Sequence, residues 1–174
     1  MRTIIPKDIL SRINIRKVLR YAIYMLAALI VQNILFTQLR IAGVCPMVLP
    51  AVAVAMGMFE GATWGPVFCL VMGIFADMAY VENTVLFAIL FPAISFAAGF
   101  IAQYFINKRF FAFMGASLLA LLVTGIVQML KTAAGDSFSG IMLNTVLLQT
   151  LWSIPPAILA YFAPARWSRE LSRE

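Results

Sequence analysis

The chain has 174 residues, of which 63% are hydrophobic and 11% are charged, and its mean hydropathy is +0.97. This composition excludes an ordinary water-soluble domain, in which about 25% of residues are charged. The formal net charge is +6 and histidine is absent, which removes the commonest general base and metal ligand. The basic residues lie at the ends of apolar segments rather than in a patch suited to nucleic acid. We therefore expect a multi-pass membrane protein with no nucleic-acid partner.

Charged residues divide the chain into apolar segments, and a helix needs about 20 such residues to cross a bilayer. The pattern predicts an all-α integral membrane protein, a six-helix transmembrane bundle. Its second and third helices are short and are separated by Gly57, Glu60 and Gly61, so a single re-entrant hairpin is the alternative for this pair. The predicted helices cover about 18–39, 46–59, 63–80, 84–106, 110–130 and 141–163 within a membrane domain at 18–163.

The distribution of Lys and Arg predicts the direction of these helices, because cytoplasmic flanks carry the excess of basic residues. Residues 1–17 form a basic amphipathic segment suited to the surface of an anionic leaflet, and residues 164–174 form a basic tail. With both termini in the cytoplasm, Arg40 and Lys131 are the only basic residues in the predicted outer loops. The cytoplasmic flanks then hold Arg2, Lys7, Arg12, Arg16, Lys17, Arg20, Lys108, Arg109, Arg166, Arg169 and Arg173.

Polar residues inside the predicted helices need partners, because an unpaired polar group is costly in hydrocarbon. Asp77 follows Gly65, Cys69 and Gly73 at intervals of four residues, which places a carboxylate at the end of a ridge of small residues suited to close helix packing. It is expected to cap or pair locally near the outer interface, and a pocket or partner contact is the alternative. The other polar intramembrane residues are Gln32, Asn33, Gln128, Lys131, Asn144 and Gln149.

Prolines fall inside two of the predicted helices. Pro92 lies in the fourth, and Pro155 and Pro156 lie in the sixth. Because proline lacks an N–H and clashes with the preceding turn, these positions are expected to kink or break the helices. The carbonyls that they release must then be satisfied by neighbouring helices or by water.

No catalytic, cofactor-binding or metal-ligating residue is predicted. Without histidine the chain has neither a Ser–His pair nor an H-E-x-x-H motif. A pair of aspartates is also excluded, because Asp136 falls in a predicted outer loop while Asp77 lies in a helix. The protein is therefore expected to be non-enzymatic and to need no cofactor.

The stretch from Pro50 to Asp77 contains Gly57, Gly61, Gly65 and Gly73. Together with the basic N-terminus, Gln32 in the first helix and a proline before the second (Pro46 or Pro50), it resembles the MreD family, rod shape-determining membrane proteins of bacteria. The resemblance covers roughly residues 18–163. It implies a fold similar to the substrate-binding subunits of energy-coupling-factor transporters.

The resemblance also implies a function. MreD proteins act without known catalysis in the cell-elongation complex of the bacterial inner membrane. They do so through the single-span protein MreC and, indirectly, through MreB filaments, RodA and a class B penicillin-binding protein. The alternative is a substrate-binding subunit of an energy-coupling-factor vitamin transporter. Those subunits carry an A-xxx-A pattern in their first helix, whereas Ala22, Ala27 and Ala28 are never four residues apart.

Overall fold

The computed structural model describes residues 15–36, 38–39, 44–79, 85–104, 110–135 and 140–171. Within these ranges the architecture is all-helical, as predicted. The basic segment 1–17 and Asp136 lie almost wholly outside the described residues. The elements are α2 (Ile15–Ile30), the π-helix η1 (Val31–Phe36), α3 (Leu49–Ala79), α4 (Leu86–Tyr104), α5 (Phe110–Gly135), α6 (Gly140–Trp152) and α7 (Ile154–Leu171).

By length and composition alone, three helices are candidate membrane spans: Leu49–Ala79, which contains a break at Gly61, Leu86–Gln103 and Phe110–Thr132. The bent pair Leu143–Trp152 and Ile154–Trp167 makes a fourth if it is one span. A shorter apolar helix covers Val18–Ile34. The described part of the chain thus has three to four candidate spans, and a count of six stays a prediction.

Helix α3 is broken at Gly61, where the backbone adopts φ 84° and ψ 177°. Such a positive φ strongly favours glycine. Two contacts show that the chain folds back at this point. A Cβ placed on Gly65 would lie 2.9 Å from the Cα of Gly57, and the Cys69 sulfur lies 3.8 Å from the carbonyl oxygen of Ala53. In a straight helix these pairs would be about 12 and 24 Å apart. Residues 49–60, the first arm, and residues 62–79, the second arm, therefore form an antiparallel hairpin.

The first arm occupies the centre of the protein, with every residue from 49 to 59 buried. The helix begins at Leu49 rather than at the predicted Pro46, and residues 45–48 before it are not helical. Twelve helical residues reach only about 18 Å, which is less than the hydrocarbon thickness of about 30 Å. Backbone without helical hydrogen bonds is tolerated at such a depth only where protein or a wet cavity surrounds it. Protein or a wet cavity must therefore surround residues 44–48.

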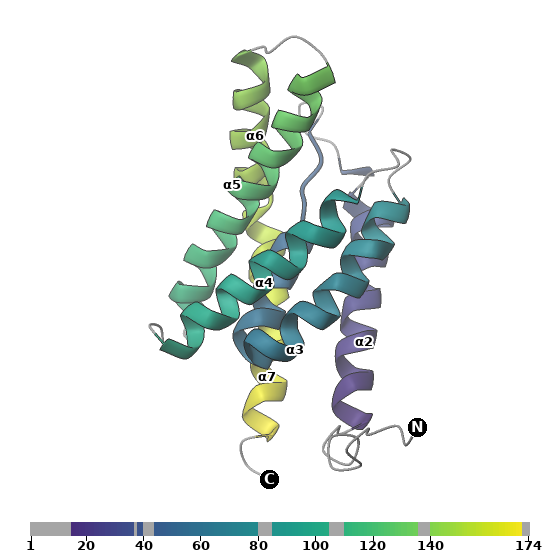
Figure 1. The fold of residues 1–174 in the computed structure, drawn as a ribbon, viewed down its shortest axis with the longest axis vertical. Helices are drawn as coiled ribbons and strands as arrows, with labels where there is room; N and C mark the ends of the chain where they lie inside the picture. The colour runs from purple at the N-terminus through teal and green to yellow at the C-terminus, as the bar shows by residue number, and fades with distance from the viewer. Residues whose placement is uncertain are drawn as a thin grey trace, which may run out of the picture.

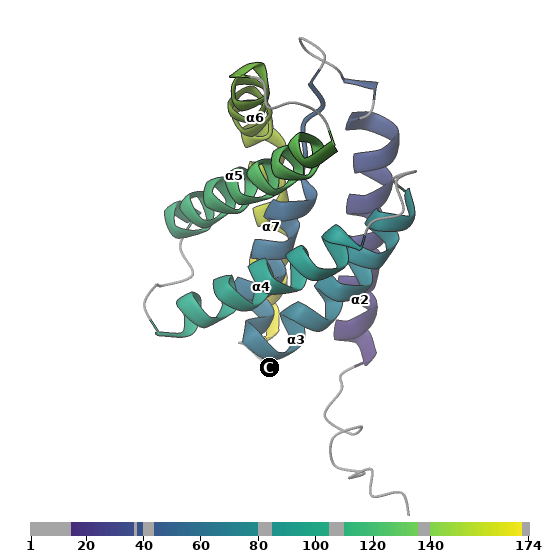
Figure 2. The ribbon, with the colours of Figure 1, turned by 45° about the horizontal axis from the view of Figure 1, so that its top comes forward.

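Small residues bring the second arm and α4 into backbone contact, and the two run side by side in Figures 1 and 2. A Cβ on Gly73 would strike the carbonyl oxygen of Phe87, and one on Gly57, in the first arm, would likewise strike that of Ser95 on α4. On α4, a Cβ on Gly99 would lie 2.7 Å from the backbone nitrogen of Ala62. The glycines identified in the sequence are thus packing positions, and side chains at these points would push the segments apart.

The start of α2 and the end of α7 lie at the same end of the protein, here called the lower end (Figure 1). The end of α5 and the start of α6 lie at the opposite, upper end. That both termini lie on one side of a membrane stays a prediction. Which side that is stays a prediction from the charges.

Candidate functional site

Three interruptions of regular helix meet towards the upper end of the protein: η1, the non-helical residues 44–48 and the junction of α6 with α7. Gln32 on η1 joins the first two. Its side-chain nitrogen donates to the carbonyl oxygen of Pro46 at 3.1 Å, and its side-chain oxygen accepts from the backbone N–H of Val48 at 2.8 Å. Gln32 is only 4% exposed, so one amide satisfies two backbone groups that no helix could pair.

Ser153 joins the third interruption to the same segment. The backbone N–H of Met47 donates to the Ser153 hydroxyl at 2.8 Å, and this hydroxyl donates to the carbonyl oxygen of Gln149 at 2.7 Å. Helices α6 and α7 are bent by 44° at this residue. Pro155 and Pro156 follow after Ile154 and cannot donate to the carbonyls four residues earlier. The bend and its prolines therefore place a hydroxyl where residues 44–48 need an acceptor.

A polar cavity opens beside these interruptions, between residues 44–47 and helices α5 and α6. It consists of two adjoining volumes of about 260 and 230 Å³, which share Gln128, Thr145 and Gln149. The first is completed by Gln32 and by Val44, Cys45, Pro46 and Met47. The second is completed by Gly125, Met129, Thr132 and Val146.

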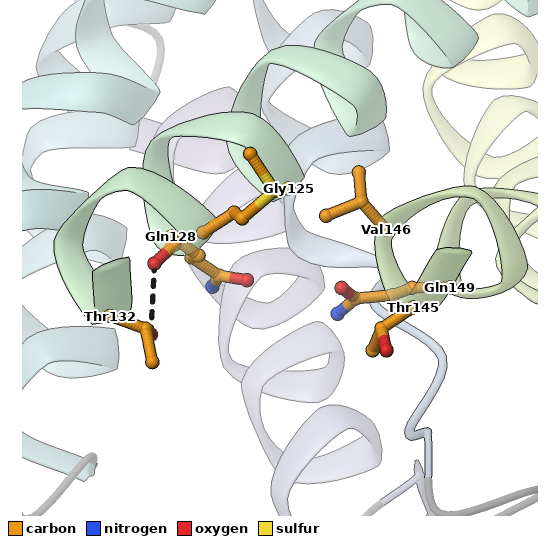
Figure 3. Close-up of a pocket in the computed structure, with 7 residues that line it drawn as sticks. Gly125, Gln128, Thr132, Thr145, Val146 and Gln149 are labelled. Atoms are coloured by element: carbon orange, nitrogen blue, oxygen red, sulfur yellow. Dashed lines mark hydrogen bonds between the residues drawn. The ribbon is translucent and has the colours of Figure 1, made fainter. Parts of the chain in front are cut away.

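The polar side chains that the described residues bring to this cavity are neutral hydrogen-bonding groups on an apolar wall. Gln128 on α5 and Gln149 on α6 point into the space between their helices (Figure 3). The Gln128 amide nitrogen lies 3.8 Å from the Met47 sulfur, a weak acceptor. The Gln149 side-chain amide makes no hydrogen bond with another described residue. Both amides thus retain most of their capacity to donate and to accept hydrogen bonds.

The cavity brings together three of the polar residues predicted inside the membrane, Gln32, Gln128 and Gln149. Asn33 and Asn144 are instead exposed on the outer faces of η1 and α6, and Lys131 is partly buried on α5. The predicted proline positions differ in whether the helix is interrupted near them. Pro92 lies inside a continuous α4, whereas the α6–α7 break falls at Ser153, just before Pro155 and Pro156.

Asp77 lies away from the cavity and acts as a cap. Its two carboxylate oxygens accept from the backbone N–H groups of Phe87 at 3.0 Å and Ala88 at 2.8 Å. These are orphan donors in the first turn of α4, and a carboxylate also interacts favourably with a helix N-terminus. This matches the predicted local cap rather than a pocket contact. Asp77 makes no ion pair with Lys131 among the described contacts.

The sequence prediction missed Ser153, Thr145 and the pairing of Tyr24 with α7. The Tyr24 hydroxyl donates to the carbonyl oxygen of Ala160 at 2.7 Å. Pro164, four residues after Ala160, cannot supply the usual helical N–H. A signal was available, since a proline within a helix identifies the carbonyl that needs another donor, but the sequence does not say which distant residue supplies it.

The described residues contain no group of three or more Cys, Asp or Glu side chains suited to a metal ion. No protein-family model, curated protein or solved structure matches this chain.

Proposed function

We propose that the protein is a non-catalytic scaffold or regulator of the bacterial cell-elongation complex, acting through a single-span, MreC-like partner. The proposal places it in the inner membrane with both termini in the cytoplasm. MreB filaments, RodA and a class B penicillin-binding protein would be indirect partners.

The support for this proposal is the MreD-like sequence pattern and the way its residues are used. Gly57, Gly61 and Gly65 shape the hairpin, while Gly73 and Asp77 fix α4 against it. If this chain shares a fold with MreD proteins, it needs a motif that sets how the helices pack, and these residues serve that purpose. These glycines and Asp77 are separate from the residues that line the cavity, whereas Gln32 and Pro46, which also carry the resemblance, belong to that lining.

Two exposed side-chain amides support the proposal of a partner that binds within the membrane. Asn33 lies beside the exposed Ile34 on η1, and Asn144 lies beside the exposed Leu143 on α6. A lipid chain cannot bond to either amide, whereas a partner helix with its own polar side chain can. Such hydrogen bonds are worth about 0.6 to 2 kcal/mol each, so they would specify a partner more than they would drive its binding.

The experiment is depletion of the protein in a rod-shaped host combined with affinity purification. We expect rounded cells and recovery of a single-span, coiled-coil membrane protein. Asn33→Leu and Asn144→Leu should each lower that recovery. Gln103→Leu, which makes the same chemical change at an exposed site of α4, should not. Normal shape on depletion, with no such protein recovered, would reject the proposal.

A substrate-binding subunit of a vitamin transporter is the second candidate, and the polar cavity favours it. Against it, the first helix lacks the A-xxx-A pattern of those subunits, since Ala22, Ala27 and Ala28 are never four residues apart. Loss of vitamin uptake in depleted cells of normal shape would favour the transporter.

A further inference from the structure

We propose that the exposed side of α2 and the start of η1 pairs with the same surface of a second copy of this chain, which makes the protein a parallel twofold dimer in the membrane. Five residues form this surface, here called the α2 face: Leu19, Ile23, Leu26, Ile30 and Asn33. The inference concerns the assembly of the chain with itself and does not depend on the proposed function.

The α2 face is turned away from the rest of the protein. Helix α2 lies at the edge of the bundle in Figures 1 and 2. Its opposite side packs inward, where Tyr21 is buried and contacts Phe68 of the second arm at 6.0 Å between ring centroids. The four apolar residues of the α2 face are 49 to 58% exposed, and Asn33 is exposed as well. No described residue of this chain covers the face.

The spacing of the α2 face is that of a coiled-coil seam. Its residues follow one another at intervals of four, three, four and three positions, which is the heptad period. Leucine falls at the d positions and isoleucine at the a positions, a choice that favours two parallel strands. Left-handed helix pairs of this kind are also the common packing in membrane bundles. A face that met only lipid would need to be apolar, but it would not need this alternation.

Asn33 indicates what kind of surface covers the α2 face. It lies 13 residues after Arg20, which is about 20 Å along the helix and inside a hydrocarbon core of about 30 Å. Its amide makes no hydrogen bond with another described residue, and a lipid chain offers none. An exposed amide at this depth requires a polar group on the molecule that covers α2.

A second copy supplies that group at the same level of the membrane. Copies of one membrane protein insert in the same direction, so two α2 helices pair in parallel around a twofold axis normal to the membrane. Each residue of the face then meets its own counterpart, and Asn33 meets Asn33. A primary amide both donates and accepts, so this pair is self-complementary.

The exposed face of α4 lacks this combination. Its amide, Gln103, is the residue before the last one of the helix, where a side chain can extend to the headgroup region. Phe96 and Phe100 on the same face stack on each other at 6.4 Å between centroids, and such rings can meet lipid with no unpaired polar group. Of these two faces, only the α2 face requires a protein partner.

The dimer is compatible with the proposed function. Pairing through α2 leaves the exposed side of α6, with Asn144, for the single-span partner. The dimer presents that side twice, and two linked sites bind a coiled-coil partner more tightly than one site does. Asn33→Leu then lowers recovery of the partner through loss of the dimer.

Cross-linking in native membranes tests the contact. Leu26→Cys places a thiol on the α2 face, and Leu119→Cys places one at a similarly exposed position of α5. The natural chain, with Cys45 and Cys69, measures the background. Because a disulfide requires Cα atoms within about 7 Å, oxidation should yield at least about tenfold more dimer from Leu26→Cys than from Leu119→Cys. Equal yields, or a product with another protein in place of the dimer, would overturn the proposal.

Variants of Asn33 test the polar contact. Förster transfer between labelled copies in lipid vesicles, at several ratios of protein to lipid, measures the dimerisation constant. Asn33→Leu should weaken the dimer about tenfold, as expected for hydrogen bonds between membrane helices. Gln103→Leu should leave it unchanged. If Asn33→Leu fails to fold, as judged by circular dichroism, Leu26→Ala replaces it, with Leu119→Ala as its control. An unchanged constant in a folded variant of the α2 face would overturn the proposal.

The dimer and the proposed function fail separately. Recovery of the single-span partner with a chain that stays monomeric would overturn the dimer alone. A dimer in cells whose shape does not depend on the protein would support the pairing of α2 and overturn the proposed function alone.

Discussion

The carboxylate of Asp77 accepts a hydrogen bond from the backbone N–H of Ala88 at 2.8 Å, so the end of the second arm caps the start of α4. The second oxygen of the same carboxylate accepts from Phe87 at 3.0 Å. A helix leaves its first N–H groups without internal partners, and inside a membrane few other acceptors are available. The ridge of small residues that ends in Asp77 thus determines both how close α4 lies and where it begins.

Replacement of Asp77 should destabilise the protein through this cap. We expect Asp77→Ala to lower the free energy of unfolding by about 1 to 3 kcal/mol, the range for a lost cap and for bonds to a charged acceptor. Asp77→Asn should cost less, because one amide oxygen can still accept. Thermal unfolding in detergent measures both effects. Glu82→Ala, which changes a nearby acid in the predicted outer loop, is the control, and an equal loss there would contradict the assignment.

A methyl group at Gly57 should be excluded by the backbone of α4. The Cβ of Gly57→Ala would overlap the carbonyl group of Ser95, and overpacking of this kind costs about 1 to 3 kcal/mol. Gly115 on α5 has nothing within 4 Å of the corresponding position. Gly115→Ala should therefore be neutral or stabilising by up to about 1 kcal/mol, the helix propensity of alanine over glycine. Melting temperatures of the two variants in one detergent should move apart, and equal shifts would refute this packing.

The features predicted from the sequence are those that depend on local pattern. Apolar segments predicted helices, the cluster of Gly57, Glu60 and Gly61 predicted a break, and the spacing of Gly65, Cys69, Gly73 and Asp77 predicted one packing face. The break lies at Gly61. The face of the second arm contacts the first arm at Gly65 and Cys69 and contacts α4 at Gly73 and Asp77. Each of these features depends on residues that lie within a few helical turns of one another in the sequence.

Features that depend on distant partners could not be predicted. The apolar residues 46–48 are predicted to be helical, yet Met47 donates its backbone N–H to Ser153, 106 positions away. The cavity likewise needs side chains from η1, α5 and α6 at once. Gln32, Gln128 and Gln149 were each recognised as polar groups in need of partners, but only the folded chain shows that they share one space.

Loss of the Gln32 amide should loosen the segment that it holds. In Gln32→Leu the carbonyl of Pro46 and the N–H of Val48 lose their partners, and each buried unpaired group costs about 1 to 3 kcal/mol. We expect faster hydrogen–deuterium exchange at Val48. Mass spectrometry of peptides from this region would measure that exchange. Asn33→Leu, at an exposed neighbouring position, should leave that exchange unchanged. Faster exchange throughout the chain in Gln32→Leu would show general unfolding rather than this local effect.

The bond between Tyr24 and α7 predicts a coupling with Pro164. Tyr24→Phe should lower the free energy of unfolding by about 1 to 3 kcal/mol, because the carbonyl of Ala160 loses its donor inside the protein. The ring would remain, and with it the edge contact to Trp167 at 5.9 Å between centroids. The effect would therefore report the hydroxyl and not the packing.

Pro164→Ala supplies an N–H four residues after Ala160, so the helix itself can satisfy the carbonyl. In that background Tyr24→Phe should cost less by about 1 kcal/mol, a coupling that a double-mutant cycle measures. Tyr161→Phe is the control, because the Tyr161 hydroxyl makes no hydrogen bond with another described residue. Its cost should be the same with Pro164 or Ala at position 164. If Tyr24→Phe also costs the same in both backgrounds, the tyrosine does not replace the missing helical donor. The carbonyl of Ala160 must then be satisfied in another way.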